Sequence, residues 1–400
     1  MDSGQVFQTP LLVGGELSFA PKRSMLLRLI RAAQPITRTD IADRLKIDKS
    51  TVTEVVRPLI DRGILRETVL ETGTPGRRPR ALSFGAEGDY FVGVNLGVRH
   101  TQVGVTSLSG EISHDDEFET PTSATRALQV VRGKISDIVR ERPDMTLQMV
   151  GVSVPGMADA ASRELVYAPN LNWRNVPIAE TIQQVVKAGV VVENDSTAAA
   201  MFESRMKIGE TADGSASNFI LIRSGTGIGV GLVIGGEVYR GTGAGRGVAG
   251  EFGHMTIVAG GKPCVCGNRG CWERYASASS ASSLYFGDRP LRPGETLPRF
   301  VDIVSKAENG DIRSRRTLEK IGDYLGIGIA NVIMGTGVPR VIISGRLVYA
   351  WQFIAEPLNA AVRRSIVGKV EGWSVEAGSP TGSALGGALE VAVEGFLSNV

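Results

Sequence analysis

The sequence predicts a two-lobed α/β protein preceded by a winged helix-turn-helix domain. Helical periodicity followed by a basic hairpin pattern predicts the winged helix over residues 21–84. After Tyr90, two successive series of alternating strands, each continued by α/β segments, predict a duplicated fold with a cleft between its lobes. We therefore expect an N-terminal tail at 1–20, the winged helix at 21–84 and the two-lobed domain at 85–400.

Three helices are expected in the winged helix. Apolar residues recur with helical spacing over 23–33 and predict the first helix. Thr37 followed by Asp40 has the spacing of a capping box, which predicts the start of the second helix. An apolar stripe predicts the third helix from about Lys49, and Pro58 should kink it or weaken its last turns.

A basic hairpin should follow these helices and form the wing. Strand patterns at 64–70 and 81–84 flank a turn rich in glycine, proline and arginine at 73–80. Residues 20–84 contain 14 Lys or Arg against 7 Asp or Glu, whereas the rest of the chain contains 30 against 35. This asymmetry, with a helix suited to the major groove and arginines suited to the minor groove, favours DNA binding over a protein interaction module. The expected DNA contacts are Lys49, Ser50, Thr51, Thr53, Arg57, Arg77, Arg78 and Arg80.

The two-lobed domain should contain two β-meanders. Strands are expected at 90–97, 100–108 and 111–118, and again at 219–222, 227–234 and 237–239. Helices near 122–141, 178–187, 196–206, 298–306, 311–336 and 350–364 accompany the shorter strands 149–154, 190–192 and 341–344. We expect lobe I to span about 85–210 together with a C-terminal helix at 382–397 that packs back on it, and lobe II to span about 216–380.

All three cysteines of the 400-residue chain lie between positions 264 and 271. With His254 ten residues upstream, Cys264, Cys266 and Cys271 form a complete Cys3His set, which suits a closed tetrahedral zinc site. A disulfide would leave one cysteine unpaired. Four protein ligands leave no position for water, so the expected Zn²⁺ is structural.

Several motifs together resemble the ROK family of sugar kinases and sugar-responsive repressors over residues 21–397. The first runs from Glu251-Phe-Gly-His254 through the cysteine cluster to Trp272-Glu273. The others are Pro155-Gly156, Pro169-Asn170-Leu171-x-Trp173, Glu193-Asn194-Asp195 and Ser224-Gly-Thr-Gly-Ile-Gly229. The resemblance implies an actin-like, hexokinase-like fold that binds a sugar between its lobes. The repressor branch of the family carries an N-terminal winged helix.

The resemblance also implies a set of sugar contacts. Carboxylates, amides and an imidazole suit hydroxyl groups that both donate and accept hydrogen bonds. His254 can ligate zinc through one ring nitrogen and meet the sugar with the other, whereas Asp195 could equally be a helix N-cap. Glu251 or Glu273 alone could be plain surface carboxylates. The implied sugar-binding residues are Gly156, Asn170, Asn194, Asp195, Glu251, His254 and Glu273.

Kinase activity is expected to be impaired or absent. The kinases of the family carry Asp-x-Gly-Gly-Thr-Lys after their first strand, where this chain has Asn95-Leu-Gly-Val-Arg-His100. An amide ligates Mg²⁺ poorly, and a valine in place of the second glycine hinders close approach to phosphate. If activity survives, Asp195 matches the catalytic base, and Gly225, Thr226 and Gly227 match the nucleotide-binding loop for ATP and Mg²⁺.

These features predict a sugar-responsive transcription regulator that acts as a repressor. Its expected partners are double-stranded operator DNA, a sugar or sugar phosphate, and further copies of the chain in a homodimer or homotetramer. The alternatives are an active ATP-dependent sugar kinase with a vestigial winged helix, and a regulator that binds a phosphotransferase protein. The sequence has no run of ~18 apolar residues and no basic signal-peptide region, so we expect no membrane insertion and a cytoplasmic location.

Overall fold

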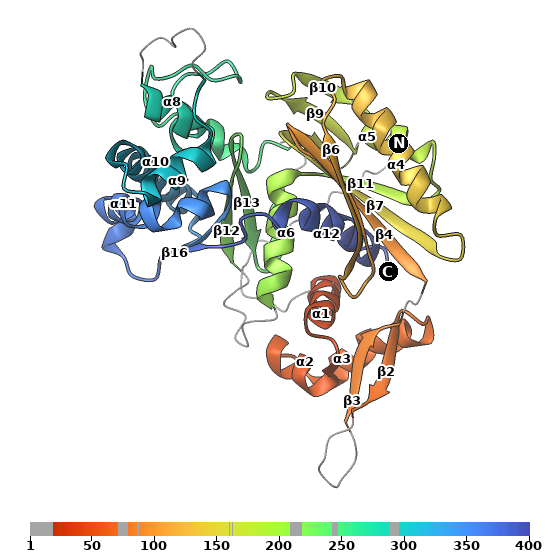
Figure 1. The fold of residues 1–400 in the computed structure, drawn as a ribbon. Coiled ribbons are helices and arrows are strands. Elements are labelled where there is room, and N and C mark those ends of the chain that lie inside the picture. Colours follow the sequence, from red (N-terminus) through yellow and green to blue (C-terminus); the bar gives the residue numbers. More distant parts are fainter. Residues whose placement is uncertain are drawn as a thin grey trace, which may run out of the picture.

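The computed structural model describes residues 19–70, 79–85, 88–159, 161, 163–208, 218–241, 247–287 and 296–400. Figure 1 shows two α/β lobes side by side, with the winged helix beneath them. The two-lobed α/β fold with its N-terminal winged helix is confirmed. Among the described residues, no helix combines the length and the apolar character that crossing a membrane requires.

The winged helix, which we call the head, contains three helices and a small antiparallel sheet. The predicted capping box is present, since the Asp40 N–H lies 3.1 Å from Thr37 Oγ1 and the Thr37 N–H lies 3.3 Å from Asp40 Oδ2. The third helix continues through Pro58 to Asp61. The sheet has the order β1-β3-β2. The elements are α1 (Phe19–Ala33), β1 (Ile36–Thr37), α2 (Arg38–Leu45), α3 (Lys49–Asp61), β2 (Leu65–Val69) and β3 (Arg80–Phe84).

Lobe I is built on a five-stranded sheet of order β11-β7-β4-β5-β6. The three meander strands pair antiparallel, while β7 pairs parallel with β4 and β11 pairs parallel with β7. Apolar residues on α4 and α5 join the core over this sheet. The elements are β4 (Asp89–Leu96), β5 (His100–Thr106), β6 (Ile112–Glu119), α4 (Ala124–Arg140), β7 (Thr146–Val154), α5 (Ile178–Gln183), β11 (Gly189–Asn194) and α6 (Asp195–Ile208).

Lobe II repeats the same topology in a sheet of order β14-β13-β12-β15-β16. Its meander is antiparallel, while β15 and β16 add parallel strands, which confirms the predicted duplication. Helices α7 to α11 lie together on this side of the molecule (Figure 1). The strands are β12 (Phe219–Ser224), β13 (Ile228–Ile234), β14 (Glu237–Val238), β15 (Arg340–Gly345) and β16 (Ser374–Ala377). The helices are η3 (Glu251–His254), α7 (Glu273–Ala276), α8 (Ser280–Phe286), α9 (Phe300–Glu308), α10 (Ile312–Thr336), η4 (Arg346–Ala350), α11 (Trp351–Arg364) and η5 (Val367–Lys369).

The C-terminal helix α12 (Ser383–Leu397) packs on the lobe I sheet, as predicted. Glycines make this contact close, because a Cβ at Gly93 would lie 2.6 Å from the backbone nitrogen of Leu389. A Cβ at Gly151 would lie 2.4 Å from the carbonyl oxygen of Ala388. The helix backbone therefore rests almost directly on the sheet backbone.

A small three-stranded sheet beside lobe I was not predicted. It has the order β10-β9-β8 and is built from β8 (Met157–Asp159), β9 (Glu164–Ala168) and β10 (Trp173–Val176). Helix α5 ends at Gln183, four residues before the predicted end. The small sheet closes over the lobe I core through the buried residues Leu165 and Trp173.

Helix α1 belongs to the core of the head and also packs against the two-lobed domain. Leu26, Leu29 and Ile30 are fully buried in one cluster with head residues. The same cluster contains Phe91 from β4 and Val393 from α12. The predicted domain boundary between residues 84 and 85 therefore does not separate two apolar cores. One core contains residues of the head and of the two-lobed domain.

Candidate functional site

A cleft lined by residues of both lobes has a volume of about 440 Å³. That volume falls within the usual range for small-molecule sites, about 300–1,000 Å³. Ends of strands and helices from both lobes line it. The cleft brings together all seven predicted sugar contacts, namely Gly156, Asn170, Asn194, Asp195, Glu251, His254 and Glu273. Asn95 and the loop residues Gly225, Thr226 and Gly227 line the same cleft.

The four predicted metal ligands form one cluster at the edge of this cleft. Their ligand atoms all lie within 4.8 Å of one another. Cys266 Sγ is 3.7 Å from Cys271 Sγ, and Cys264 Sγ is 3.6 Å from His254 Nδ1. Tetrahedral zinc bonds imply separations of about 3.8 Å between two sulfurs and about 3.6 Å between sulfur and nitrogen. Donor set and spacing therefore fit Zn²⁺, and the group could bind a metal.

A carboxylate lies near each ring nitrogen of His254, and the one near Nδ1 is on the same side as Cys264. His254 Nε2 lies 3.7 Å from Glu251 Oε2, and Nδ1 lies 3.6 Å from Glu273 Oε1. Burial raises the pKa of Glu251 to about 7, and the negative charges of Asp195 and Glu273 act in the same direction. A carboxyl group that titrates near neutral pH can both donate and accept hydrogen bonds with a polyol.

Asp195 is held by an arginine that the sequence analysis did not single out. Arg223 Nη1 lies 2.7 Å from Asp195 Oδ2, and Ser196 Oγ donates to Asp195 Oδ1 at 3.0 Å. Arg223 lies on β12, directly before the Ser224-Gly225 turn, and lines the cleft. The signal available in the sequence was a charged residue within an otherwise apolar strand. The guanidinium offsets part of the negative charge gathered around Glu251.

Asn194 takes the capping position that the sequence analysis considered for Asp195. Its Oδ1 accepts hydrogen bonds from the backbone N–H groups of Ser196 at 2.9 Å and Thr197 at 3.1 Å. Its Nδ2 donates to the carbonyl oxygen of Gly156 at 2.8 Å. Helix α6 begins at Asp195, so the carboxylate stands in the first turn and faces the cleft. The amide of Asn194 thus fixes the backbone on which Asp195 is mounted.

The glycine-rich loop after β12 packs closely against the predicted sugar contacts. A Cβ at Gly227 would lie 2.3 Å from Glu273 Oε2, and a Cβ at Gly229 would lie 1.8 Å from Ser196 Oγ. A side chain at either position would therefore have to displace the carboxylate of Glu273 or the hydroxyl of Ser196. Gly225 meets nothing within 4 Å, so its glycine has no such packing reason.

Asn95, which the sequence predicts to stand where the kinases of the family carry an aspartate, lines the cleft. The side chain is buried, and its Nδ2 donates to Gln102 Oε1 at 3.2 Å. Its Oδ1 accepts from Ser153 Oγ at 3.0 Å. These contacts employ the amide as both donor and acceptor, a role that a carboxylate could not fill without rearrangement.

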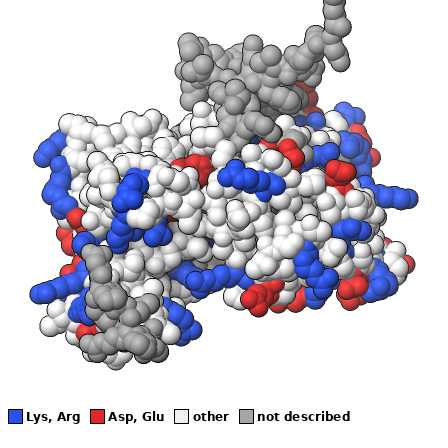
Figure 2. Space-filling view, turned by 90° about the horizontal axis from the view of Figure 1, so that it is seen from above, with Lys and Arg blue, Asp and Glu red and all other residues white. Residues whose placement is uncertain are grey.

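The residues predicted to contact DNA lie on two parts of the head. Lys49, Ser50, Thr53 and Arg57 are exposed on α3, and Thr51 is half-buried. Arg80 starts β3, is exposed and lies 3.4 Å from Glu67. The other two predicted contacts, Arg77 and Arg78, lie outside the described residues. On the face shown in Figure 2, basic and acidic side chains are both present on a mostly uncharged surface.

The fold and the cleft together define a class of protein: a two-lobed, sugar-kinase-like domain joined to a winged helix. The model of the ROK family matches residues 91–394, and the model of the MarR family matches residues 21–68. The chain belongs to the ROK family.

Known proteins similar to this chain include regulators and kinases. The xylose repressor of Bacillus subtilis is 29% identical over 85% of this chain and 86% of its own length. A crystal structure of a ROK family transcriptional regulator, a homolog of the Escherichia coli MLC protein, has a TM-score of 0.76 at 23% identity and covers 95% of this chain and 97% of its own. A ROK glucokinase from Streptomyces griseus, solved with glucose and AMPPNP, has a TM-score of 0.65 at 26% identity and covers 76% of this chain and 99% of its own.

Proposed function

We propose that the protein is a sugar-responsive DNA-binding transcription regulator that acts as a repressor. The observation that carries the proposal is that all seven predicted sugar contacts line one interlobe cleft in a chain that begins with a winged helix. Similarity to the xylose repressor extends over 85% of the chain and supports the same function.

In this proposal the sugar lies among Asp195, Glu251, His254 and Glu273. Carboxylates that accept from hydroxyls, together with an imidazole, suit a polyol better than an apolar ligand. Asn170 is exposed at the cleft rim, where its amide would contact the sugar edge. Asn194 holds the start of helix α6 and the carbonyl oxygen of Gly156 through its hydrogen bonds, and both residues line the same site.

A structural Zn²⁺ would be held by His254, Cys264, Cys266 and Cys271. When bound, the ion supplies a rigid anchor for its loop, and it would fix the ring of His254 so that one nitrogen remains for the sugar. Without a metal, burial raises the pKa of the Cys264 thiol. Glu273 lies 3.1 Å from Cys264 Sγ and would act as an outer-sphere partner of that ligand.

DNA binding is assigned to the N-terminal end of α3 and to the wing. Ser50 and Thr53 would face base edges, while Lys49, Arg57 and Arg80 would face phosphates or the minor groove. Arg77 and Arg78 complete the proposed wing contacts. A homodimer or homotetramer would present two heads to two half-sites of the operator. Light scattering of the free protein measures how many copies of the chain assemble.

An active ATP-dependent sugar kinase is the less favoured candidate. Asp195, which would have to accept a proton from the sugar, is ion-paired with Arg223, and Asn95 stands at the position of the metal-organising carboxylate. The intact Gly225-Thr226-Gly227 turn is the feature that keeps this candidate open. A coupled ATP-consumption assay over hexoses, pentoses and amino sugars should give background rates only.

The deciding experiment is a sugar panel. Thermal shifts with D-xylose, D-glucose, N-acetyl-D-glucosamine and glucose 6-phosphate should identify a ligand, since binding to the native state raises its stability. The hit should then change the affinity for a duplex enriched by the protein from a random pool, measured at fixed salt. Absence of any shift would point to a protein effector, such as a phosphotransferase component, and would count against the sugar proposal.

A further inference from the structure

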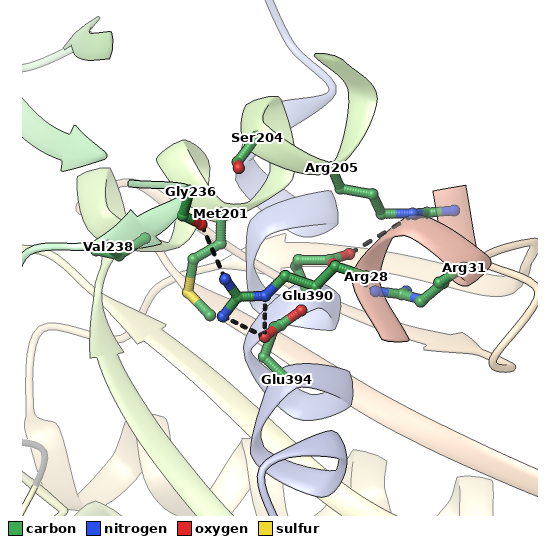
Figure 3. A pocket seen from close by; sticks show the side chains of 9 residues that line it. All are labelled: Arg28, Arg31, Met201, Ser204, Arg205, Gly236, Val238, Glu390 and Glu394. Atoms are coloured by element: carbon green, nitrogen blue, oxygen red, sulfur yellow. Dashed lines mark hydrogen bonds and ion pairs between the residues drawn. The ribbon is translucent and has the colours of Figure 1, made fainter. Parts of the chain in front are cut away.

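Helix α1 of the head packs against three elements of the two-lobed domain, and we call the surface that they form the seat. Figure 3 shows α1 arginines facing helix α12, helix α6 and the turn between β13 and β14. Helix α12 packs on the lobe I sheet, whereas the turn at Gly236 belongs to the lobe II sheet. The same helix of the head therefore touches structure from both lobes.

Arg28 makes the contact to both lobes with one guanidinium group. Its Nε donates to Glu394 Oε2 on α12 at 2.8 Å. Its Nη1 donates to the carbonyl oxygen of Gly236 at 2.8 Å, and its Nη2 donates to Glu237 Oε2 at 2.9 Å. The side chain of Arg28 is 17% exposed and that of Glu394 is 8% exposed, while that of Glu237 is 44% exposed. The link to α12 is thus buried, and the link to lobe II lies nearer the solvent.

A second cluster ties α1 to the neighbouring helices. Arg31 is ion-paired with Glu390 on α12, and both side chains are almost fully buried. Arg205 on α6 lies 3.6 Å from the same carboxylate. Burial lowers the pKa of Arg205, and the positive charge of Arg31 acts in the same direction. Three arginines and three glutamates therefore balance in the seat, and each depends on its partners because buried charges are costly when unpaired.

Each element of the seat also reaches the interlobe cleft. Strand β13 starts at Ile228 in the cleft and leads to the turn that contacts Arg28, over about 23 Å. Helix α6 starts at Asp195 in the cleft and carries Arg205 about 15 Å further along. Helix α12 starts in the cleft at Ser383 and carries Glu390 and Glu394 in the seat. Regular strands and helices transmit displacement over such lengths with little internal bending.

We propose that Arg28 couples the interlobe cleft to the orientation of the DNA-binding head. This inference rests on the proposed sugar response, and it identifies Arg28 as the residue through which a change in the cleft alters DNA binding. A change in the angle between the lobes moves the β13–β14 turn relative to α12. Arg28 cannot then keep its bonds to Glu394 and to Gly236 and Glu237 at once, so α1, and with it the head, must shift. Arg28 is a positioning residue, because it lies in neither the cleft nor the DNA-contacting surface.

The test removes the charged part of the lobe II link, the Glu237 carboxylate, and leaves the bonds of Arg28 to Gly236 and to α12 in place. Glu237→Ala is suitable because its carboxylate is half exposed, so the variant should fold. Glu319→Ala is the matched control, since Glu319 is a lobe II carboxylate of similar exposure, 39%, paired with Arg315 away from the head. Sugar affinity and DNA affinity with and without sugar are measured for the full-length wild type and both variants. The probes are the four panel sugars and the duplex enriched by the wild type.

Glu237→Ala should bind the sugar within about twofold of wild type while the sugar-induced change in DNA affinity falls at least about threefold; such couplings are commonly about 5- to 150-fold. Glu319→Ala should match the wild type in every measurement. A wild-type response in Glu237→Ala overturns the role of Arg28. Loss of sugar binding in Glu237→Ala also overturns it, because the defect would then lie in the cleft. If the wild type itself responds to none of the sugars, the proposed function fails first, and the coupling falls with it.

Discussion

Replacing Cys266 by serine tests whether a metal shapes the sugar cleft. Cys266 is half-buried, and its Sγ lies 3.7 Å from Cys271 Sγ in the ligand cluster. A serine hydroxyl is a poor ligand that stays protonated, and its shorter side chain does not reach the metal position. Loss of an outer-sphere partner already costs about 10- to 100-fold in metal affinity, so loss of a direct ligand should cost more.

The effect on sugar binding follows from His254. Without the ion, its ring is no longer fixed between Cys264 and Glu251, so one well-oriented hydrogen bond to the sugar is lost. Such a bond contributes about 1 kcal/mol, which corresponds to about a fivefold weaker sugar affinity. We expect Cys266→Ser to lose its zinc, to melt at a lower temperature and to bind sugar about fivefold more weakly.

Metal content by atomic absorption, melting by calorimetry and sugar affinity by titration calorimetry measure the three effects. Val265→Ser is the control, because Val265 lies between two ligands and is 54% exposed. This control should keep its zinc and its sugar affinity. A Cys266→Ser protein that is free of zinc and yet binds sugar like the wild type would refute the proposed link between metal and cleft.

Three further predictions address the head, the packing of α12 and the kinase alternative. Thr37→Ala removes half of the capping box and should lower the stability of the head by about 1 kcal/mol in urea unfolding, with a Thr37→Ser change close to neutral. Gly151→Ala places a Cβ 2.4 Å from the carbonyl oxygen of Ala388 and should destabilise the protein by about 1–3 kcal/mol; an unchanged melting temperature would contradict the close packing. Asn95→Asp should leave ATP consumption at background, because the Arg223–Asp195 ion pair remains; sugar-dependent turnover would show that Asn95 alone blocks catalysis.

Local patterns in the sequence were sufficient for the helices of the head and for most strands of the duplicated sheets, although β16 was not predicted. The Thr37–Asp40 capping box lies within one turn, and a series of three alternating strands occurs in each lobe. Strand β1 was missed because its two residues, Ile36 and Thr37, become a strand only by pairing with Leu82 and Ala81. The short strands β8 to β10 are likewise defined by their partners rather than by a long alternating run.

The candidate site could be predicted as a set of residues but not as a set of contacts. Motif positions placed Glu251, His254 and Glu273 around the cysteine cluster, and the structure brings them into one cleft. The Arg223–Asp195 ion pair joins residues 28 positions apart, and no local spacing indicates such a pairing. Asn194 and Asp195 are adjacent residues with similar capping preference, so the sequence alone could not decide which of them caps the helix.

The glycine-lined contact between α12 and the lobe I sheet has a consequence for motion. Side chains that separate a helix from a sheet can change rotamer and so absorb small displacements at the interface. At Gly93 and Gly151 the two backbones meet directly, and no rotamers are available there. Helix α12 and the lobe I sheet should therefore move as one rigid body. Any motion that carries a change in the cleft to the head must then be a motion of lobe II relative to that body.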